Sequence, residues 1–152
     1  MIINSEAEVV ILLKRLAKTL SNVGLKRVVV AIDELNEEKE FIEIHKSIIN
    51  FILKECANEF MVESIELKRK NIRGTTADAR SMSIILLKKH LDSRHQDIVN
   101  ILNLTNHTVV SHAIKKFQEL DFNVKVDKKF LEIFNTVDKK VYDYKIVQNK
   151  TR

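Results

Sequence analysis

The chain has 152 residues and a net charge of +5, a size that suits one compact domain or a small domain with an appended segment. It contains no proline and only two glycines, so the turn residues that a β-rich fold needs are scarce. Its single cysteine, Cys56, excludes an internal disulfide, and no apolar run approaches the roughly 20 residues that cross a bilayer. The N-terminus lacks the pattern of a signal peptide. We therefore expect a helical, cytoplasmic protein.

Charge is distributed unevenly along the chain. Residues 1–66 carry 8 Lys or Arg against 12 Asp or Glu, whereas residues 67–152 carry 18 against 9. The two parts therefore have net charges of −4 and +9. A basic part of this kind indicates contact with a polyanion, although a basic surface that serves only solubility has the same composition.

Hydrophobic periodicity predicts an all-α protein. Residues 25–35 are ambiguous, because Val28–Val30 favours a strand, but no second strand is available to pair with it and we expect a helix. A short helical turn at 65–67 precedes a basic, polar loop at 68–76, and the residues from Tyr142 onward look polar and frayed. Gly24 suits a left-handed C-cap after the first helix. The expected helices are Ser5–Ser21, 25–35, Glu37–Phe60, Asp78–Leu91, His95–Leu102, His107–Leu120 and Asp127–Val137.

A turn followed by a helix with two unlike faces begins at Asn103. Asn106 has the side chain of an N-cap, which accepts from the free backbone N–H groups of a first helical turn. Together with His95–Leu102, this helix forms a helix-turn-helix candidate, although an ordinary amphipathic surface helix has the same pattern. One face repeats the apolar residues Val110, Ala113 or Ile114, Phe117 and Leu120, and the other carries Thr108, Ser111, His112 and Lys115.

From Cys56 onward the chain resembles domain IV, the C-terminal DNA-binding domain of the bacterial replication initiator DnaA. The similarity runs from about Ala57 to Leu120 and more loosely to Val137. Residues 106–113, Asn-His-Thr-Val-Val-Ser-His-Ala, resemble the signature Asp-His-(Ser/Thr/Ala)-Thr-Val-x-His-Ala, and residues 68–73 stand where the family has its basic loop. The resemblance implies an all-α helical bundle with a helix-turn-helix, similar to the Trp repressor, in the C-terminal two thirds of the chain.

The resemblance also implies roles for individual residues. In the family the start of the second helix touches bases in the major groove, the basic loop enters the minor groove, and neighbouring basic residues hold phosphates. The second histidine of the signature packs within the domain, so His112 is expected to be structural. By position, the implied base contacts are Asn106, His107 and Thr108, the implied phosphate contacts are Arg80, Lys88, Lys115 and Lys116, and the minor-groove candidates are Arg73 and Lys70.

Several positions depart from the family pattern. Asn106 replaces the signature Asp, Thr105 replaces the basic residue before it, and Val109 replaces its second Thr. Asn103-Leu104 stands where the family has Gly-Gly, and Ile72 stands where it has its minor-groove Arg. These changes indicate a sequence preference different from that of the family.

Rival chemistries have little support. His107 and His112 are about 500° apart around a helix, so they do not share a face as metal ligands would, and no Ser-His-Asp set has a reason to meet. We therefore expect no metal, no cofactor and no enzymatic activity. No Gly-x-x-x-x-Gly-Lys-Ser/Thr motif occurs, so ATP-driven origin melting is not expected.

Three regions are predicted. Residues 1–55 form an acidic helical region, residues 56–137 the DNA-binding domain, and residues 138–152 a basic, polar tail. The main hypothesis is a replication-associated or regulatory protein that binds double-stranded DNA, with residues 1–55 serving a homodimer or a replication or transcription partner. The alternative is a helical adaptor that has reused the fold and lost specific DNA reading, which Thr105 and Ile72 favour.

Overall fold

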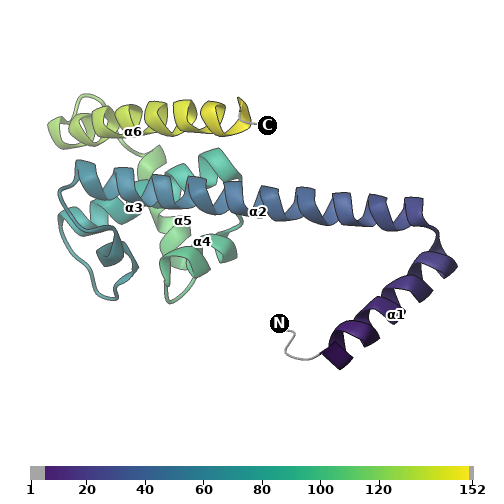
Figure 1. Cartoon of the computed structure of the whole chain (residues 1–152). Helices are drawn as coiled ribbons and strands as arrows, with labels where there is room; N and C mark the ends of the chain where they lie inside the picture. The colour runs from purple at the N-terminus through teal and green to yellow at the C-terminus, as the bar shows by residue number, and fades with distance from the viewer. Residues whose placement is uncertain (1–5, 151–152) are drawn as a thin grey trace. The chain divides into compact units, whose positions relative to one another are not determined.

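The structure, a computed structural model, describes residues 6–150, and their side chains except those of 6–9, 22, 23 and 25 (Figure 1). Ser5, the expected first residue of the first helix, and the last two residues of the chain lie outside this range. Two compact units divide between Glu43 and Ile44. The expectation of an all-α protein is confirmed. The elements are α1 (Glu6–Val23), α2 (Leu25–Glu59), the 3-10 helix η1 (Ser64–Lys68), α3 (Thr75–Leu91), α4 (His95–Leu102), α5 (Thr108–Gln118) and α6 (Lys125–Lys150).

Helix α2 is one continuous helix where two were expected. No proline or glycine interrupts it, and Asn36, the residue between the two expected helices, has only a modestly unfavourable helix propensity. The prediction that residues 25–35 are helical is therefore confirmed, and the predicted break between this helix and the next is wrong. Gly24 separates α1 from α2 with a φ of 86°, and its N–H donates to the carbonyl of Leu20 at 3.1 Å, so the expected left-handed cap is confirmed.

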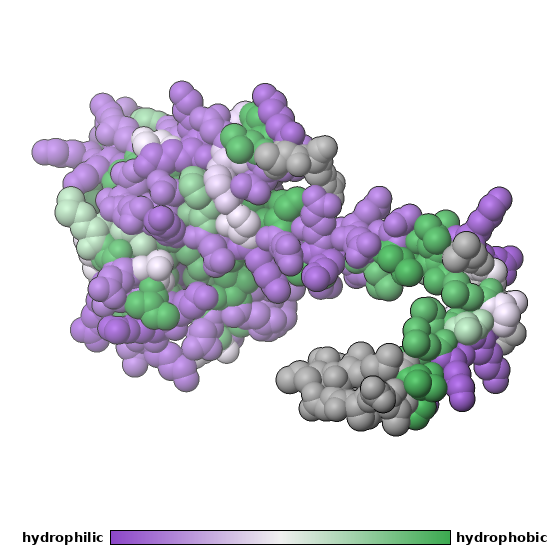
Figure 2. Space-filling model, viewed as in Figure 1, coloured by the Kyte–Doolittle hydropathy of each residue, from purple (hydrophilic) through white to green (hydrophobic). Residues whose placement is uncertain are grey.

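The first unit has no buried side chain among those that the structure describes, which are residues 10–21, 24 and 26–43. Figure 2 shows hydrophobic residues at the surface along α1 and the first part of α2. A soluble unit normally covers such residues.

The second unit contains the hydrophobic core, and α3 is its central helix. Along α3 the buried stretch from Met82 to Leu87 leaves no exposed face, so this helix is covered on all sides. Burial of each large side chain contributes on the order of 1.5–3 kcal/mol. Cys56 is among the buried residues, and its burial raises the pKa of the thiol to about 12. The other helices contribute Ile52 and Leu53 (α2), Ile98 and Leu102 (α4), Val110 and Ala113 (α5), and Phe134, Val137 and Val141 (α6).

Helix α6 continues to Lys150, so the expectation of a frayed, polar segment from Tyr142 is wrong. Val141 is fully buried, the Tyr144 ring stacks on Phe51 of α2 with centroids 4.1 Å apart, and the Tyr144 hydroxyl lies 2.5 Å from Ser47 Oγ. The apolar positions of α6 keep helical spacing through this segment, and the charged residues between them hide the pattern in the sequence.

An ion-pair cluster holds α6 against the C-terminal turn of α3. Asp138 accepts from Lys89 Nζ and lies against His90 Nε2, both at 2.8 Å. Burial lowers the pKa of His90, an effect that its bond to Asp138 only partly offsets. Burial alone would raise the pKa of Asp138, but the hydrogen bonds from Lys89 and His90 outweigh it and lower the pKa. Asp138 was expected to begin the tail, and it is instead part of the domain.

No helix in the described range is long and apolar enough to cross a membrane.

Candidate nucleic-acid interface

Helices α4 and α5 and the turn between them form the expected helix-turn-helix. Helix α4 has the predicted bounds, and α5 begins one residue later and ends two residues earlier than predicted. Asn103 ends α4 in the left-handed conformation with a φ of 51°, which asparagine tolerates better than most residues. The next residue, Leu104, donates from its N–H to the carbonyl of Val99 at 3.0 Å and packs on the core. An asparagine can therefore stand where the family has a glycine without loss of the turn.

Asn106 was expected to be the N-cap, but His107 holds that position and has no side-chain cap bond; Asn106, one residue earlier, caps the first turn of α5 through its own side chain. Its Oδ1 accepts the N–H of Thr108 at 3.0 Å, and the carbonyl of His107 accepts the N–H of Ser111 at 3.1 Å. Because Oδ1 is engaged with the backbone, the Nδ2 group of Asn106 is the part that remains to donate outward. Asn106, His107 and Thr108, the three implied base-contact residues, are all exposed.

The back of α5 is firmly packed. Val110 and Ala113 are buried, and Phe117 contacts two rings of α6, with centroid distances of 6.5 Å to Phe130 and 4.7 Å to Phe134. Helix α5 is thus fixed in position while its other side faces solvent. A helix that reads DNA needs this combination, because its side chains must meet base edges without rearrangement of the backbone.

The outward face of α5 carries Thr108, His112 and Lys115, which recur at steps of four and three residues and are exposed. The expectation that His112 packs within the domain is wrong. It follows the buried Val110 by two positions, about 200° around the helix, and therefore points away from the core. Lys115 is 73% exposed and only loosely paired with Glu119, at 3.9 Å.

Lys116 lies to one side of this face. It lines an apolar cavity together with Phe117 and Leu120, near the start of α6. Of the two implied phosphate contacts on α5, Lys115 therefore lies nearer the centre of this face, and Lys116, one turn after His112, lies at its edge beside the cavity.

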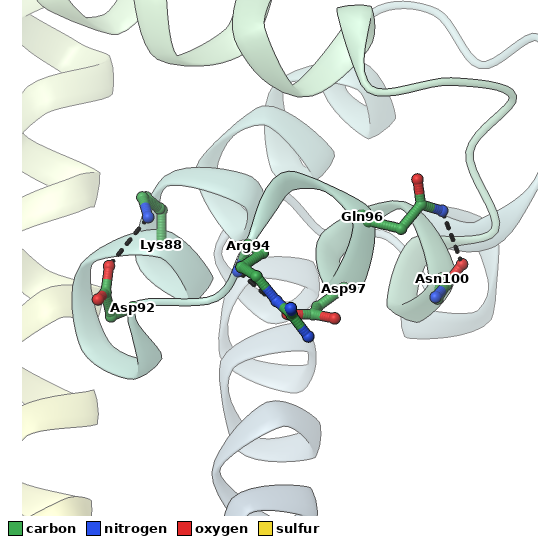
Figure 3. A network of polar contacts seen from close by, with 6 residues as sticks. All are labelled: Lys88, Asp92, Arg94, Gln96, Asp97 and Asn100. Carbon is green, nitrogen blue, oxygen red and sulfur yellow. Dashed lines mark hydrogen bonds and ion pairs between the residues drawn. The ribbon is translucent and has the colours of Figure 1, made fainter.

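The start of α4 brings in residues that the sequence analysis missed. His95 Nδ1 lies 3.4 Å from Ser111 Oγ on the recognition helix. Arg94, directly before α4, is 87% exposed and pairs with Asp97 at 3.2 Å. Figure 3 shows Arg94 in a group of exposed or half-buried polar side chains from α4 and the end of α3. Its position next to the first helix of the motif is the signal that identifies Arg94.

Lys88 belongs to the same group (Figure 3). It lies in the last turn of α3 and pairs with Asp92 at 2.9 Å. Asp92 is 95% exposed, so this ion pair is weak and leaves the ammonium group available to a phosphate.

The basic loop between η1 and α3 is held by Arg80. The Nε group of Arg80 donates to the carbonyl of Leu67 at 2.7 Å, and another guanidinium nitrogen donates to the carbonyl of Arg69. Burial lowers the pKa of Arg80 from its ordinary value, as expected of a half-buried cation. Two of its donors thus fix the end of η1 and the first residue of the loop. Lys70 and Arg73, the two minor-groove candidates, remain exposed in the loop.

No group of three His, Cys, Asp or Glu side chains in the described part of the chain is placed to hold a metal ion.

Comparisons with known proteins agree with this geometry. Residues 49–117 match the family model described as the bacterial DnaA protein helix-turn-helix. The chromosomal replication initiator protein DnaA of Aliarcobacter butzleri is 28% identical over 109 residues, which cover 72% of this chain and 23% of that protein. DnaA of Nautilia profundicola is 29% identical over 96 residues, which cover 59% and 22%. The chain therefore spans less than a quarter of the length of these relatives.

A crystal structure of a DNA replication initiation factor has the same fold. It matches with a TM-score of 0.56 and 21% identity, over 89% of this chain and 37% of that one. Residues 49–117, which match the family model, contain the whole turn between α4 and α5, the start of α5 and the buried side of that helix. Within residues 49–117 the chain is thus similar to the helix-turn-helix of bacterial DnaA proteins.

Proposed function

We propose that this protein binds double-stranded DNA with sequence preference, and that α5 lies in the major groove. One observation carries the proposal. The capped start of α5 exposes Asn106, His107 and Thr108, while the opposite side of the helix is buried, within the segment that matches the DnaA helix-turn-helix.

The side chains divide by role in this proposal. Asn106, His107 and Thr108 contact base edges, and the exposed His112 adds a polar group one turn further along the same face. Lys115 contacts phosphate from that face.

Two further regions hold the DNA backbone. Lys88 and Arg94 bind phosphate beside the start of α4. Lys70 and Arg73 reach the minor groove from the basic loop, and Arg80 acts by holding that loop in position. Lys116 serves as a peripheral phosphate contact, since it lies at the edge of the reading face, beside the cavity.

The relatives that the chain matches are chromosomal replication initiators. By this similarity we place the protein at a replication origin or a regulatory site, in the cytoplasm with the nucleoid, as a binding protein without a catalytic step. The DNA-binding part corresponds to the second unit, which begins at Ile44 and includes α6 through Lys150, and so is longer than the expected 56–137. The region before it contacts a protein partner.

A fluorescence-anisotropy titration tests the proposal. Sites selected from random duplexes and a scrambled duplex are each titrated at two salt concentrations. We expect tighter binding to the selected sites, and affinity for both duplexes that falls steeply with salt, because phosphate contacts release counterions. Binding that is absent, or equal at both salt concentrations, would overturn the proposal and favour the adaptor alternative.

A further inference from the structure

The described side chains before Ile44 form no buried core, although many of them are large and apolar. None of these side chains is buried, and the apolar residues of α1 recur at helical spacing, as do those in the first part of α2. Figure 2 shows these residues at the surface. They include Val10, Ile11, Leu12, Leu13, Leu16, Val29, Val30, Ile32, Leu35 and Ile42.

The exposed apolar area matches what one side of a stable dimer provides. A large side chain has on the order of 150 Å² to bury, so ten half-exposed ones present on the order of 700 Å². A standard protein interface buries about 800 Å² on each partner. A monomer rarely leaves a patch of this size uncovered.

One stretch of each helix carries a charge complementary to that of the other. From Val10 to Ser21, α1 carries Lys14, Arg15 and Lys18 and no acidic residue. From Asp33 to Glu43, α2 carries six acidic residues against one lysine. A pairing of α1 with this part of α2 therefore brings opposite charges together at the edge of an apolar contact.

We infer that this region is a homodimerisation segment, in which α1 of each copy packs on residues 25–43 of α2 in the other copy. The inference deepens the proposed function by naming a second copy of this chain as the partner. Such an exchange is two-fold symmetric and closed, so the same surfaces are satisfied in both copies. The acidic stretch of α2 disfavours an anionic membrane as the covering surface. Two reading helices would then bind a site with two half-sites.

Analytical ultracentrifugation of the full chain without DNA tests the inference. We expect the wild type to shift from one-chain to two-chain mass over two decades of concentration. Leu13→Asp should raise the dimer dissociation constant by on the order of tenfold or more, because it places a charge in the apolar contact. Ser21→Asp, on the side of the same helix that carries Lys14 and Lys18, is the matched control and should change the dissociation constant much less. Wild-type mass that stays at one chain would overturn the inference.

A charge-reversal experiment distinguishes the dimer from a single chain in which α1 packs on its own α2. One variant carries Lys14→Glu, Arg15→Glu and Lys18→Glu, and the other carries Glu34→Lys, Glu37→Lys and Glu38→Lys. Each variant alone should dimerise at least about tenfold more weakly, and the two mixed should form a heterodimer of near wild-type affinity.

Three results contradict the inference. The first is that mixing the two charge-reversal variants does not restore dimerisation. The second is that wild-type behaviour returns only when both sets of substitutions are in one chain. The third is a chain that stays monomeric and binds anionic vesicles instead. The thermal unfolding of each variant checks that the second unit is intact. Because DNA is absent, failure here leaves the DNA titration as a separate result.

Discussion

The side chain of Asn106 has two functions that substitution can separate. Its Oδ1 caps α5 by accepting the N–H of Thr108 at 3.0 Å, and its Nδ2 faces outward. Asn106→Asp keeps the cap and removes the outward donor, whereas Asn106→Ala removes both. The two variants thus distinguish a residue that stabilises the helix from one that reads DNA.

The thermal stability expected of each variant depends on whether it keeps the helix cap. Loss of an Asn cap costs about 1 kcal/mol, with a range of roughly 0.5–2. Asn106→Ala should therefore lower the midpoint of thermal unfolding by about 3–5 °C for a domain of this size. Asn106→Asp should leave it unchanged or raise it, because a carboxylate at a helix N-terminus contributes about 0.3–1 kcal/mol.

The two variants should differ in thermal stability but lose DNA affinity to a similar extent. Both variants lose the Nδ2 donor, so each should lose about 1–3 kcal/mol on the preferred duplex and much less on a scrambled one. Asn106→Asp should also shift the preference towards a base that presents a donor. Circular dichroism on heating and anisotropy on both duplexes measure the two effects. If Asn106→Asp is destabilised as much as Asn106→Ala, the cap is refuted. If neither variant loses affinity on the preferred duplex, the reading role is refuted.

Three other predictions follow from the structure. Lys115→Ala should weaken binding to all duplexes and reduce the salt slope by about 0.9, whereas Lys116→Ala should change both much less; equal effects in the anisotropy titration would contradict the assignment of faces. Tyr144→Ala should destabilise the domain by about 2–3 kcal/mol in urea unfolding, because it removes a stacked ring and a hydrogen bond. Tyr142 is 60% exposed, so the control Tyr142→Ala should destabilise the domain by less than about 0.5 kcal/mol. Burial lowers the pKa of His90, so the folded domain binds this proton less readily than the unfolded chain. Stability should therefore fall as the pH drops below about 6.5, by at most about 1.4 kcal/mol per pH unit from this group, and His90→Gln should flatten that part of the urea-midpoint profile; an unchanged slope would contradict it.

Much of the fold could be predicted because it depends on local patterns. The bounds of α4, the turn at Asn103 and the cap at Asn106 each follow from residue types within a few positions of one another. The continuity of α2 and the length of α6 depend on tertiary contacts. Tyr144 is held by Phe51, which lies 93 positions earlier in the chain, and no local pattern reveals that contact.

At the candidate site, the exposure of a residue could be predicted where it depends on one helix, and contacts between distant segments could not. Exposure of Asn106 and His107 follows from their place at the start of an amphipathic helix. Arg80 was predicted as a phosphate contact, but two of its donors hold carbonyls of η1 and of the basic loop, 13 and 11 positions earlier in the chain. His112 was assigned to the core by analogy, although its distance from the buried Val110 places it outside.

The departures from the family signature are at exposed positions, where a substitution can alter contacts with DNA without weakening the core. Thr105, Asn106 and Val109 are exposed, whereas Val110 and Ala113, which agree with the signature, are buried. Substitutions at exposed positions cost the core little, so this domain can keep the backbone of the family and present different groups to DNA. Asn106 offers a donor where the family has an acceptor, and Val109 offers methyl groups where the family has a hydroxyl. We therefore expect selection from random duplexes to return a site that differs from that of the family at the bases which these residues meet. Reversion of both residues by Asn106→Asp with Val109→Thr should move the selected site towards the family's, and an unchanged site would show that the specificity resides elsewhere in the domain.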